Sequence, residues 1–430
     1  MRIKATLSKL PDFNRNFYFF LLISLLIFGC SQKEDDSQST SDSTQGTVRG
    51  LPRAWTQMGR NSASSGGISN TTSESLYPDI TINGNNNPYV CWASYYEEGP
   101  ERQFEIYTKH WNGTSWVEIS NNSASGNGIS KTIGNSTNPQ IVISRTDNPI
   151  ICWREEVNQS TPSVGQIYVK QWDDTNWIEM GRNSASDGGI SQNEKYSSAP
   201  SITLDLEGYP IICWGEMMEI ESQIHIRRWN GYAWARIKEI IAEIPKAASS
   251  QTQIFPAVVQ PKVAATNEGN PIVCWADYSR GNYEIYVKEW DGQAWLDMGS
   301  DSASKSGISG SPGQSINPDI TVDRDGVPMI CWQDDTNGNS EIYVRRWNNY
   351  EWVQMGQSSA SSGGISDDEI QSSMPRISVD RENSPVISWT AGNDIYVKYW
   401  NGSSWIETAQ GSASKTDNTE TNSVAGTSAI

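Results

Sequence analysis

The sequence repeats one turn between two strands, and the residues at the two ends of this turn are often acidic. In its shortest copy, a two-residue Gly-Asn turn would place Trp389 opposite Tyr396 and Ala391 opposite Asp394. Longer copies grow in steps of four residues, which adds two residues to each arm and keeps the same side chains opposed. That register pairs Glu155 with Gln166, Glu216 with Gln223, Asp277 with Glu284, and Asp334 with Glu341. The candidate ligand-binding residues are the carboxylates of these pairs: Glu155, Glu216, Asp277, Glu284, Asp334 and Glu341.

Two of the pairs oppose like charges, which is unfavourable unless something cationic relieves them. The segment from Asp334 to Glu341, DDTNGNSE, is rich in oxygen ligands and bends at a glycine, without matching the spacing of an EF-hand. One interpretation is a calcium ion held by Asp334, Asp335 and Glu341. The other is relief by solvent or by neighbouring basic residues such as Lys288 and Arg345.

Catalytic constellations are sparse in this sequence. The two histidines, His110 and His225, fall at repeat positions, which argues against a histidine-based zinc site or triad. A pair of carboxylates can hydrolyse a glycoside, and Glu216 or Asp334 could take that role, but we assign no catalytic residue. Five cysteines share one repeat position, so we expect them to be buried and unpaired: Cys91, Cys152, Cys213, Cys274 and Cys331.

Tryptophan marks the repeat, because all 19 tryptophans fall on three repeat positions. One series is Trp92, Trp153, Trp214, Trp275, Trp332 and Trp389. The paired series is Trp111/Trp116, Trp172/Trp177, Trp229/Trp234, Trp290/Trp295, Trp347/Trp352 and Trp400/Trp405, and Trp55 is an extra copy of the second member. No tryptophan is left for a unique site, so we expect these side chains to be structural first.

Each unit reads as four short strands, β-branched and aromatic runs bounded by Gly, Asn and Pro. Six such units in tandem, each too small to bury its own faces, predict an all-β fold, a six-bladed β-propeller of four-stranded antiparallel blades. A β-sandwich or a row of separate domains is the alternative. Trp55–Met58 is a seventh copy of the fourth strand. We therefore predict that this N-terminal outer strand completes the last blade and closes the ring, and that Trp405–Glu407 is displaced or added outside it.

The connections divide into constant and variable ones. The interval from the first-strand proline to the second-strand tryptophan is 14 residues in all six units. The interval from the second-strand tryptophan to the third-strand tryptophan is 19, 19, 15, 15, 15 and 11 residues. Variable connections share one end of the ring, where we expect binding. The Ser-Gly loop, as in Asn61–Ser69, links successive blades and is no phosphate loop, because no helix follows it. A longer connection, Trp234 to Pro261, either packs on a neighbouring blade or offers a surface to a partner.

The N-terminus has basic residues, an apolar run and then Ile27-Phe28-Gly29-Cys30, the pattern of a secretion signal. Its end resembles the lipobox of bacterial lipoproteins, which implies that Cys30 is lipid-modified. The acidic residues that follow resemble a tag for the outer face of the outer membrane. An uncleaved anchor helix is the alternative, although the apolar run is short for one. The expected organisation is a signal peptide at 1–29, a lipidated and disordered tether at 30–52, the propeller at 53–408 and a disordered tail at 409–430.

Residues 1–29 hold four basic residues and one acidic residue, so their removal changes the net charge from −18 to −21. A surface of that charge disfavours nucleic acid and suits cations, neutral glycans or basic proteins. The repeats resemble those of bacterial surface proteins grouped with the sialidase-like propellers, although the Asp-boxes of that family are absent. We therefore expect a non-enzymatic module at the cell surface that binds a glycan or a protein through its variable loops. The alternative is a sialidase-like glycan hydrolase or lyase.

Overall fold

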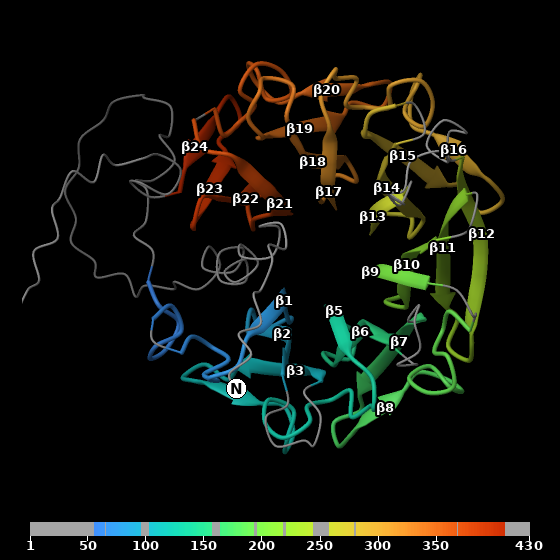
Figure 1. Cartoon of the computed structure of the whole chain (residues 1–430), viewed down its shortest axis with the longest axis vertical. Coiled ribbons are helices and arrows are strands. Elements are labelled where there is room, and N and C mark those ends of the chain that lie inside the picture. The colour runs from blue at the N-terminus through green and yellow to red at the C-terminus, as the bar shows by residue number, and fades with distance from the viewer. Residues whose placement is uncertain are drawn as a thin grey trace, which may run out of the picture.

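The computed structural model describes residues 56–64, 66–95, 103–156, 164–192, 196–217, 221–243, 258–278, 281–367 and 369–408. In these ranges six four-stranded antiparallel sheets stand around a central axis (Figure 1). The predicted six-bladed propeller is confirmed. The described residues include no helix, and hence none that could span a membrane. The predicted signal peptide, tether and tail lie outside the described residues.

The strands follow one another in chain order within every blade. The first blade holds β1 (Ser75–Ile82), β2 (Pro88–Tyr95), β3 (Phe104–Trp111) and β4 (Trp116–Glu118), and the second holds β5 (Ser136–Ile143), β6 (Pro149–Glu156), β7 (Gly165–Trp172) and β8 (Trp177–Glu179). The third holds β9 (Tyr196–Leu204), β10 (Pro210–Met217), β11 (Glu221–Trp229) and β12 (Trp234–Glu243), and the fourth holds β13 (Val258–Ala265), β14 (Pro271–Asp277), β15 (Glu284–Trp290) and β16 (Trp295–Asp297). The fifth holds β17 (Ser315–Val322), β18 (Pro328–Asp334), β19 (Glu341–Trp347) and β20 (Trp352–Gln354), and the sixth holds β21 (Ser372–Val379), β22 (Pro385–Ala391), β23 (Asp394–Trp400) and β24 (Trp405–Glu407).

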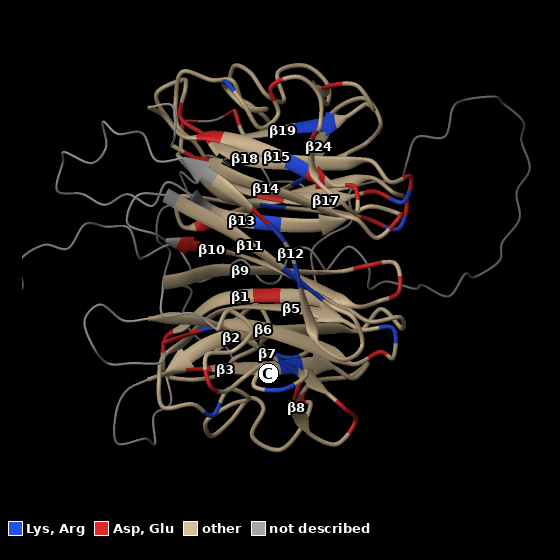
Figure 2. Cartoon of the chain, turned by 90° about the vertical axis from the view of Figure 1, so that its right-hand side faces the viewer, with Lys and Arg blue, Asp and Glu red and all other residues tan. Residues whose placement is uncertain are grey.

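The first strand of each blade lies nearest the axis and the fourth lies at the rim (Figure 1). Viewed from the side, the strands run between the two ends of the ring, and Lys, Arg, Asp and Glu residues mingle in the turns at one end (Figure 2). The hydrophobic core lies between neighbouring blades. Trp332 of β18, for example, packs in one cluster with Cys274 and Val287 of the preceding blade. All five described cysteines are buried and free, as predicted.

The Ser-Gly loop covers the outer edge of the third strand in its own blade. The fourth strand is too short to pair with the whole third strand, because β8 reaches only Lys170, Gln171 and Trp172 of β7. The loop continues the edge pairing: Val169 N donates to Ser184 O at 2.8 Å, and Ile190 N donates to Ile167 O at 2.8 Å. The first, fourth and fifth blades repeat both bonds. The loop therefore satisfies a strand edge that would otherwise stay open.

In the third blade a longer strand replaces the loop. β12 pairs with β11 over its whole length, from Trp234 opposite Trp229 to Glu243 opposite Glu221. Ile240 of β12 is 4% exposed and packs in one cluster with Val263 of the next blade. The described part of this long connection therefore packs on a neighbouring blade, the first of the two alternatives that the sequence left open. Ile241 on its other face is 56% exposed, and residues 244–257 lie outside the described residues.

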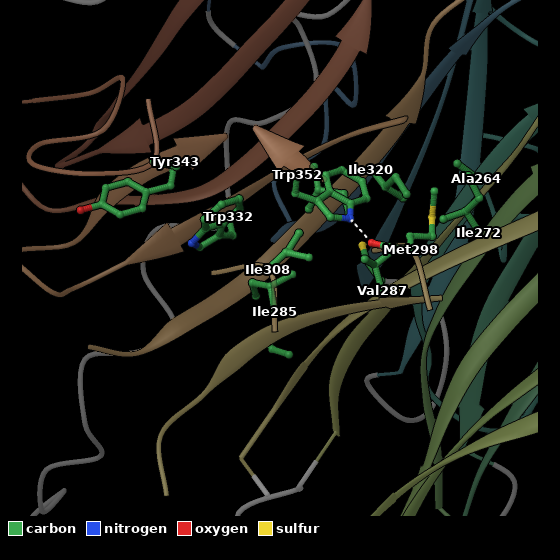
Figure 3. Packing of buried hydrophobic residues seen from close by; sticks show 14 residues of the cluster. Ala264, Ile272, Ile285, Val287, Met298, Ile308, Ile320, Trp332, Tyr343 and Trp352 are labelled. Carbon is green, nitrogen blue, oxygen red and sulfur yellow. Dashed lines mark hydrogen bonds between the residues drawn. The ribbon is translucent and has the colours of Figure 1, made fainter. Parts of the chain in front are cut away.

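Fourth-strand tryptophans fasten the third, fifth and sixth blades to the methionine carbonyl of the blade before each. Trp352 Nε1 donates to Met298 O at 3.1 Å, the bond drawn in Figure 3. The equivalent bonds join Trp234 to Met180 at 2.8 Å and Trp405 to Met355 at 3.1 Å. The glycine after each methionine lies on the partner tryptophan of the next blade; a Cβ added to Gly299, for instance, would stand 3.0 Å from the Trp347 ring. The paired tryptophans therefore have the structural role that the repeat predicts.

The predicted displacement of Trp405–Glu407 is wrong. These residues form β24 and pair with β23 as the fourth strand of the sixth blade. Trp55 lies outside the described residues, and residues 56–58 lie in no strand. Met58 O instead accepts a hydrogen bond from Trp116 Nε1 at 2.9 Å, so this segment packs on the first blade as each fourth strand packs on the next blade. The sixth and first blades stand farther apart than other neighbours (Figure 1).

Replacing Trp352 with phenylalanine removes an interblade hydrogen bond while keeping an aromatic ring. We expect Trp352→Phe to lower the free energy of unfolding by about 1 kcal/mol more than Trp177→Phe. Trp177 is the matched control, because its buried Nε1 has no hydrogen-bond partner among the described residues. Urea denaturation of both variants measures the difference, and equal losses would contradict the proposed role of the bond.

Alanine at Gly189 should be far more damaging than alanine at Gly67, the equivalent loop glycine before the first blade. Both have a positive φ, +64° and +62°, which costs an alanine about 1 kcal/mol. At Gly189 the new Cβ would lie 2.1 Å from Ile167 O, whereas at Gly67 it meets no atom within 4 Å. Thermal unfolding should show an additional loss of about 1–3 kcal/mol for Gly189→Ala. An equal loss at Gly67 would mean that the sixth blade closes over this loop.

Candidate functional site

The register predicted for the candidate carboxylates is correct. Trp389 pairs with Tyr396 and Ala391 with Asp394, as the two-residue turn requires. The four longer copies keep that register: Glu155 faces Gln166, Glu216 faces Gln223, Asp277 faces Glu284, and Asp334 faces Glu341. These side chains therefore occupy equivalent places, at the end of each blade that carries the variable connections.

All six candidate carboxylates are buried rather than presented at the surface. Their exposed fractions lie between 1% for Asp334 and 4% for Glu216 and Asp277. The last serine of the Ser-Gly loop serves those on the third strand. Ser309 Oγ donates to the Glu284 carboxylate and accepts a bond from Ile285 N at 2.9 Å. Ser366 serves Glu341 in the same way, so a ligand on the variable face would meet the loops before it met these carboxylates.

Two second-strand carboxylates, Glu155 and Asp334, bond to serines of the first strand, and Asp334 also bonds to a serine of the interblade connection. Asp334 Oδ2 accepts bonds from Ser315 Oγ and Ser311 Oγ, each at 2.7 Å. Ser311 N also approaches Glu284 Oε2 at 3.4 Å, so one serine joins carboxylates of two neighbouring blades. Burial raises the pKa of Glu284, and the Asp334 charge raises it further, against the lowering effect of its hydrogen bonds. The polar layer between blades is thus held by neutral donors.

Lys288 does not relieve these pairs, because its Nζ lies 2.5 Å from Asp297 Oδ1. The three residues considered for calcium have protein donors: Asp335 Oδ1 accepts from Gln314 N at 2.6 Å, and Glu341 Oε1 accepts from Asn339 Nδ2 at 2.6 Å. Over the described ranges no three His, Cys, Asp or Glu side chains are grouped so that they could hold a metal ion. Calcium binding at Asp334, Asp335 and Glu341 stays a prediction.

Neither histidine belongs to a catalytic constellation with a nucleophile. His225 stacks on Trp214 with ring centroids 5.6 Å apart, and its Nε2 lies 3.1 Å from Glu216 Oε2. His110 stacks on Tyr89 at 5.1 Å, and burial lowers its pKa. His225 occupies the place where other blades put a tyrosine against the buried tryptophan, such as Tyr168 against Trp153. Both histidines therefore act as aromatic packing residues.

A different set of side chains meets at the axis of the ring. The residue that follows the first-strand proline lines a central cavity of ≈ 230 Å³ in every blade. These residues are Asp79, Gln140, Ser201, Lys262, Asp319 and Arg376. Four of the six are charged and no two neighbouring blades carry the same residue, although the flanking isoleucines and prolines repeat almost without change. The axis is therefore the part of the fold where the blades differ most in chemistry.

A β-bulge at each proline orients these side chains. The residue before the proline has a left-handed backbone in all six blades, with φ between 50° and 55°: Tyr77, Asn138, Ala199, Gln260, Asn317 and Met374. Proline cannot donate to a ladder, so it suits a bulge on an innermost strand with a free edge. In the first strand the register shifts between Leu76 and Asp79. The bulge thus precedes, in each blade, the residue that lines the central cavity.

The axial residues of alternate blades brace the ring. Asp79 Oδ2 accepts a bond from Ile141 N of the next blade at 2.8 Å, and Asp319 Oδ2 accepts one from Ile377 N at 2.9 Å. Ser201 Oγ does the same for Val263 N at 3.2 Å. Burial raises the pKa of Asp79 to about 6, against the lowering effect of the Ile141 hydrogen bond and of the Lys262 and Arg376 charges.

A smaller cavity of ≈ 90 Å³, here called the mouth pocket, shares Gln140, Lys262 and Arg376 with the central cavity. Its polar lining consists of Tyr77, Asn138, Gln140, Gln260, Lys262 and Arg376. Tyr77 precedes Asp79 in β1, and the start of β1 pairs with the end of β2, where the variable connection begins. The mouth pocket therefore opens toward the variable face, and none of the described residues that line it is Asp or Glu. It is our candidate binding site.

Sequence reasoning missed the axial residues, although a signal was present. The first strand carries Pro-x-Ile in five units and Pro-x-Val in the fourth, and the residue x varies among the units. Connection lengths do not show this variation. Comparing the six copies position by position would have singled out the residues on both sides of the proline.

No family model matches this chain, and no curated protein matches it in sequence. Solved structures do resemble it. A Dyadobacter fermentans protein of unknown function is 12% identical with a TM-score of 0.44, over 77% of this chain and 93% of that one. The GH93 α-L-arabinofuranosidase of Fusarium graminearum is 13% identical with a TM-score of 0.43, over 77% and 93%. The fucose-specific lectin from Aleuria aurantia is 14% identical with a TM-score of 0.43, over 79% and 95%.

Glu105 allows a test of the buried polar layer, because burial raises its pKa to about 7. Below pH ~4.5 the folded and unfolded states both bind the proton. Between pH ~4.5 and ~7 only the folded state keeps it, so rising pH destabilises the wild type. Glu105→Gln should not show this loss, and its advantage should grow to at most about 3 kcal/mol by pH 8.

Thermal unfolding of both proteins between pH 4 and pH 8 measures that advantage. The fold accepts glutamine here, because Gln166 holds the equivalent place in the second blade, where its Oε1 accepts from Ser191 Oγ at 2.6 Å. Glu268→Gln, in an exposed turn, is the control and should follow the wild type. A constant difference between Glu105→Gln and the wild type across this range would contradict the assignment.

Proposed function

We propose that the protein is a glycan-binding module that holds its ligand in the mouth pocket, at the variable end of the propeller axis. One observation carries the proposal: the positions on either side of the first-strand proline vary among the blades, and five residues before the proline and three after it line this pocket. Amide side chains such as Asn138, Gln140 and Gln260 both donate and accept, which matches the paired hydroxyl groups of a sugar. Tyr77 adds an aromatic surface for the apolar face of a ring.

The proposal includes display from a membrane. The pattern Ile27-Phe28-Gly29-Cys30 supports lipidation of Cys30, and the Ser-, Thr- and Asp-rich residues 31–52 suit a tether between the lipid and the propeller. The acidic segment after Cys30 supports placement at the outer membrane and exposure at the cell surface. A tethered propeller could then turn its variable face toward external glycans.

Glycoside hydrolysis is the second candidate, and the pKa of Asp79 favours it. A carboxyl group with a pKa of about 6 can act as a general acid, and Asp319 on another blade supplies a second carboxylate in the same cavity. Each of these carboxylates has one oxygen bonded to a backbone N–H of the next blade. Because Ser201 has that same bracing role without a carboxylate, we favour binding over hydrolysis.

A glycan array tests the binding proposal, with Gln140→Leu as the site variant. Loss of one amide in the mouth pocket should weaken binding of the best saccharide about 5-fold or more. Gln293→Leu, in an exposed turn at the constant face, should bind like the wild type. Equal binding by both variants would contradict the site.

The same saccharides should also be incubated with the wild type, and their products analysed. Turnover that Asp79→Asn or Asp319→Asn abolishes would replace the binding module with the hydrolase.

A further inference from the structure

Two of the six residues that follow the first-strand prolines and line the central cavity are cations without an ion pair in the described ranges. Lys262 and Arg376 both line the mouth pocket and the central cavity, and both are partly buried. The nearest polar partner recorded for Lys262 Nζ is Gln140 Oε1 at 3.4 Å. Arg376 Nη1 bonds only to Pro375 O, at 3.3 Å. Neither forms a salt bridge with any residue in the described ranges.

This arrangement is unusual for a chain with so many carboxylates. Asp79 and Asp319 line the same cavity, yet their oxygens bond to backbone N–H groups of the next blade. Partial burial of a cation without a salt bridge is unfavourable, because the charge loses water and no carboxylate contacts it directly. Burial lowers the pKa of Lys262 and the Arg376 charge lowers it further, against the raising effect of the Asp319 and Asp79 charges. The two cations therefore lie close enough to repel each other.

We propose that Lys262 and Arg376 bind the carboxylate of an acidic sugar in the mouth pocket. This inference rests on the glycan-binding function proposed above and names its ligand class. A carboxylate between the two cations would relieve their repulsion and form charge-assisted hydrogen bonds, which are roughly twice as strong as neutral ones. Gln140, whose Oε1 faces Lys262, stands beside them to bond a neighbouring hydroxyl group.

The charge of the rest of the molecule limits the ligand to a single acidic unit. The chain as a whole is strongly acidic, with a net charge of −18. Such a protein repels a polyanion, whereas one carboxylate at the end of a neutral glycan interacts mainly with Lys262 and Arg376. The inferred ligand is therefore an oligosaccharide whose end sugar carries one carboxylate and whose other sugars are neutral.

Matched saccharide pairs test this inference by calorimetry on the intact propeller. The two members of a pair differ only in the end sugar, galacturonic acid against galactose, or glucuronic acid against glucose. We expect the acidic member of at least one pair to bind about 10-fold more tightly at low salt, with a preference that shrinks as salt is added.

Lys262→Gln and Arg376→Gln should each reduce the preference about 10-fold, and Lys305→Gln, an exposed lysine paired with Asp301, should leave it unchanged. Thermal unfolding without ligand checks that the variants fold, and removal of an unpaired cation should not lower the midpoint.

The outcomes separate the two proposals. Equal affinity for both members of every pair, or a preference that survives in both Lys262→Gln and Arg376→Gln, overturns the carboxylate inference and leaves glycan binding standing. If the wild type binds neither acidic nor neutral members on the array or in calorimetry, the proposed function falls, and the inference falls with it.

Discussion

The open edge of the third strand is the constraint on which this propeller depends. Three-residue fourth strands such as β8 leave half of that edge unpaired, and an unpaired edge is costly when buried and prone to aggregation when exposed. The Ser-Gly loop solves both problems, since its backbone pairs with the edge and its last serine bonds to the buried third-strand side chain. Where the loop is absent, β12 grows to ten residues and covers the edge as a strand.

Edge coverage also sets the distance between blades. The connection continues from the loop to the first strand of the next blade, and Ser311 in this connection bonds both Glu284 of the preceding blade and Asp334 of the next one. On the opposite side of the blade, tryptophans such as Trp352 bond to the preceding blade. Polar contacts near one end and aromatic contacts near the other hold each sheet at two points, which fixes its angle around the axis.

Sequence periodicity predicted the features that repeat and failed at those that do not. Strand number, cysteine state and the pairing of Asp334 with Glu341 follow from spacing alone, because a β-strand alternates with a period of two. Burial of those carboxylates could not be read from spacing, since it depends on a loop folding back onto its own blade. The position of Trp405–Glu407 depends on which of two segments that begin with tryptophan pairs with β23, and the local pattern does not distinguish between them.

The bulge at each first-strand proline separates the central cavity from the core. The residue after the proline lines the cavity, whereas the apolar contacts that hold the blades begin one position later, at residues such as Ile141 and Ile377. Three of the six axial residues, Gln140, Lys262 and Arg376, brace no neighbouring blade through their side chains. Single substitutions there can alter ligand choice at little cost in stability, so duplicated blades could diverge into distinct specificities while their shared architecture persists.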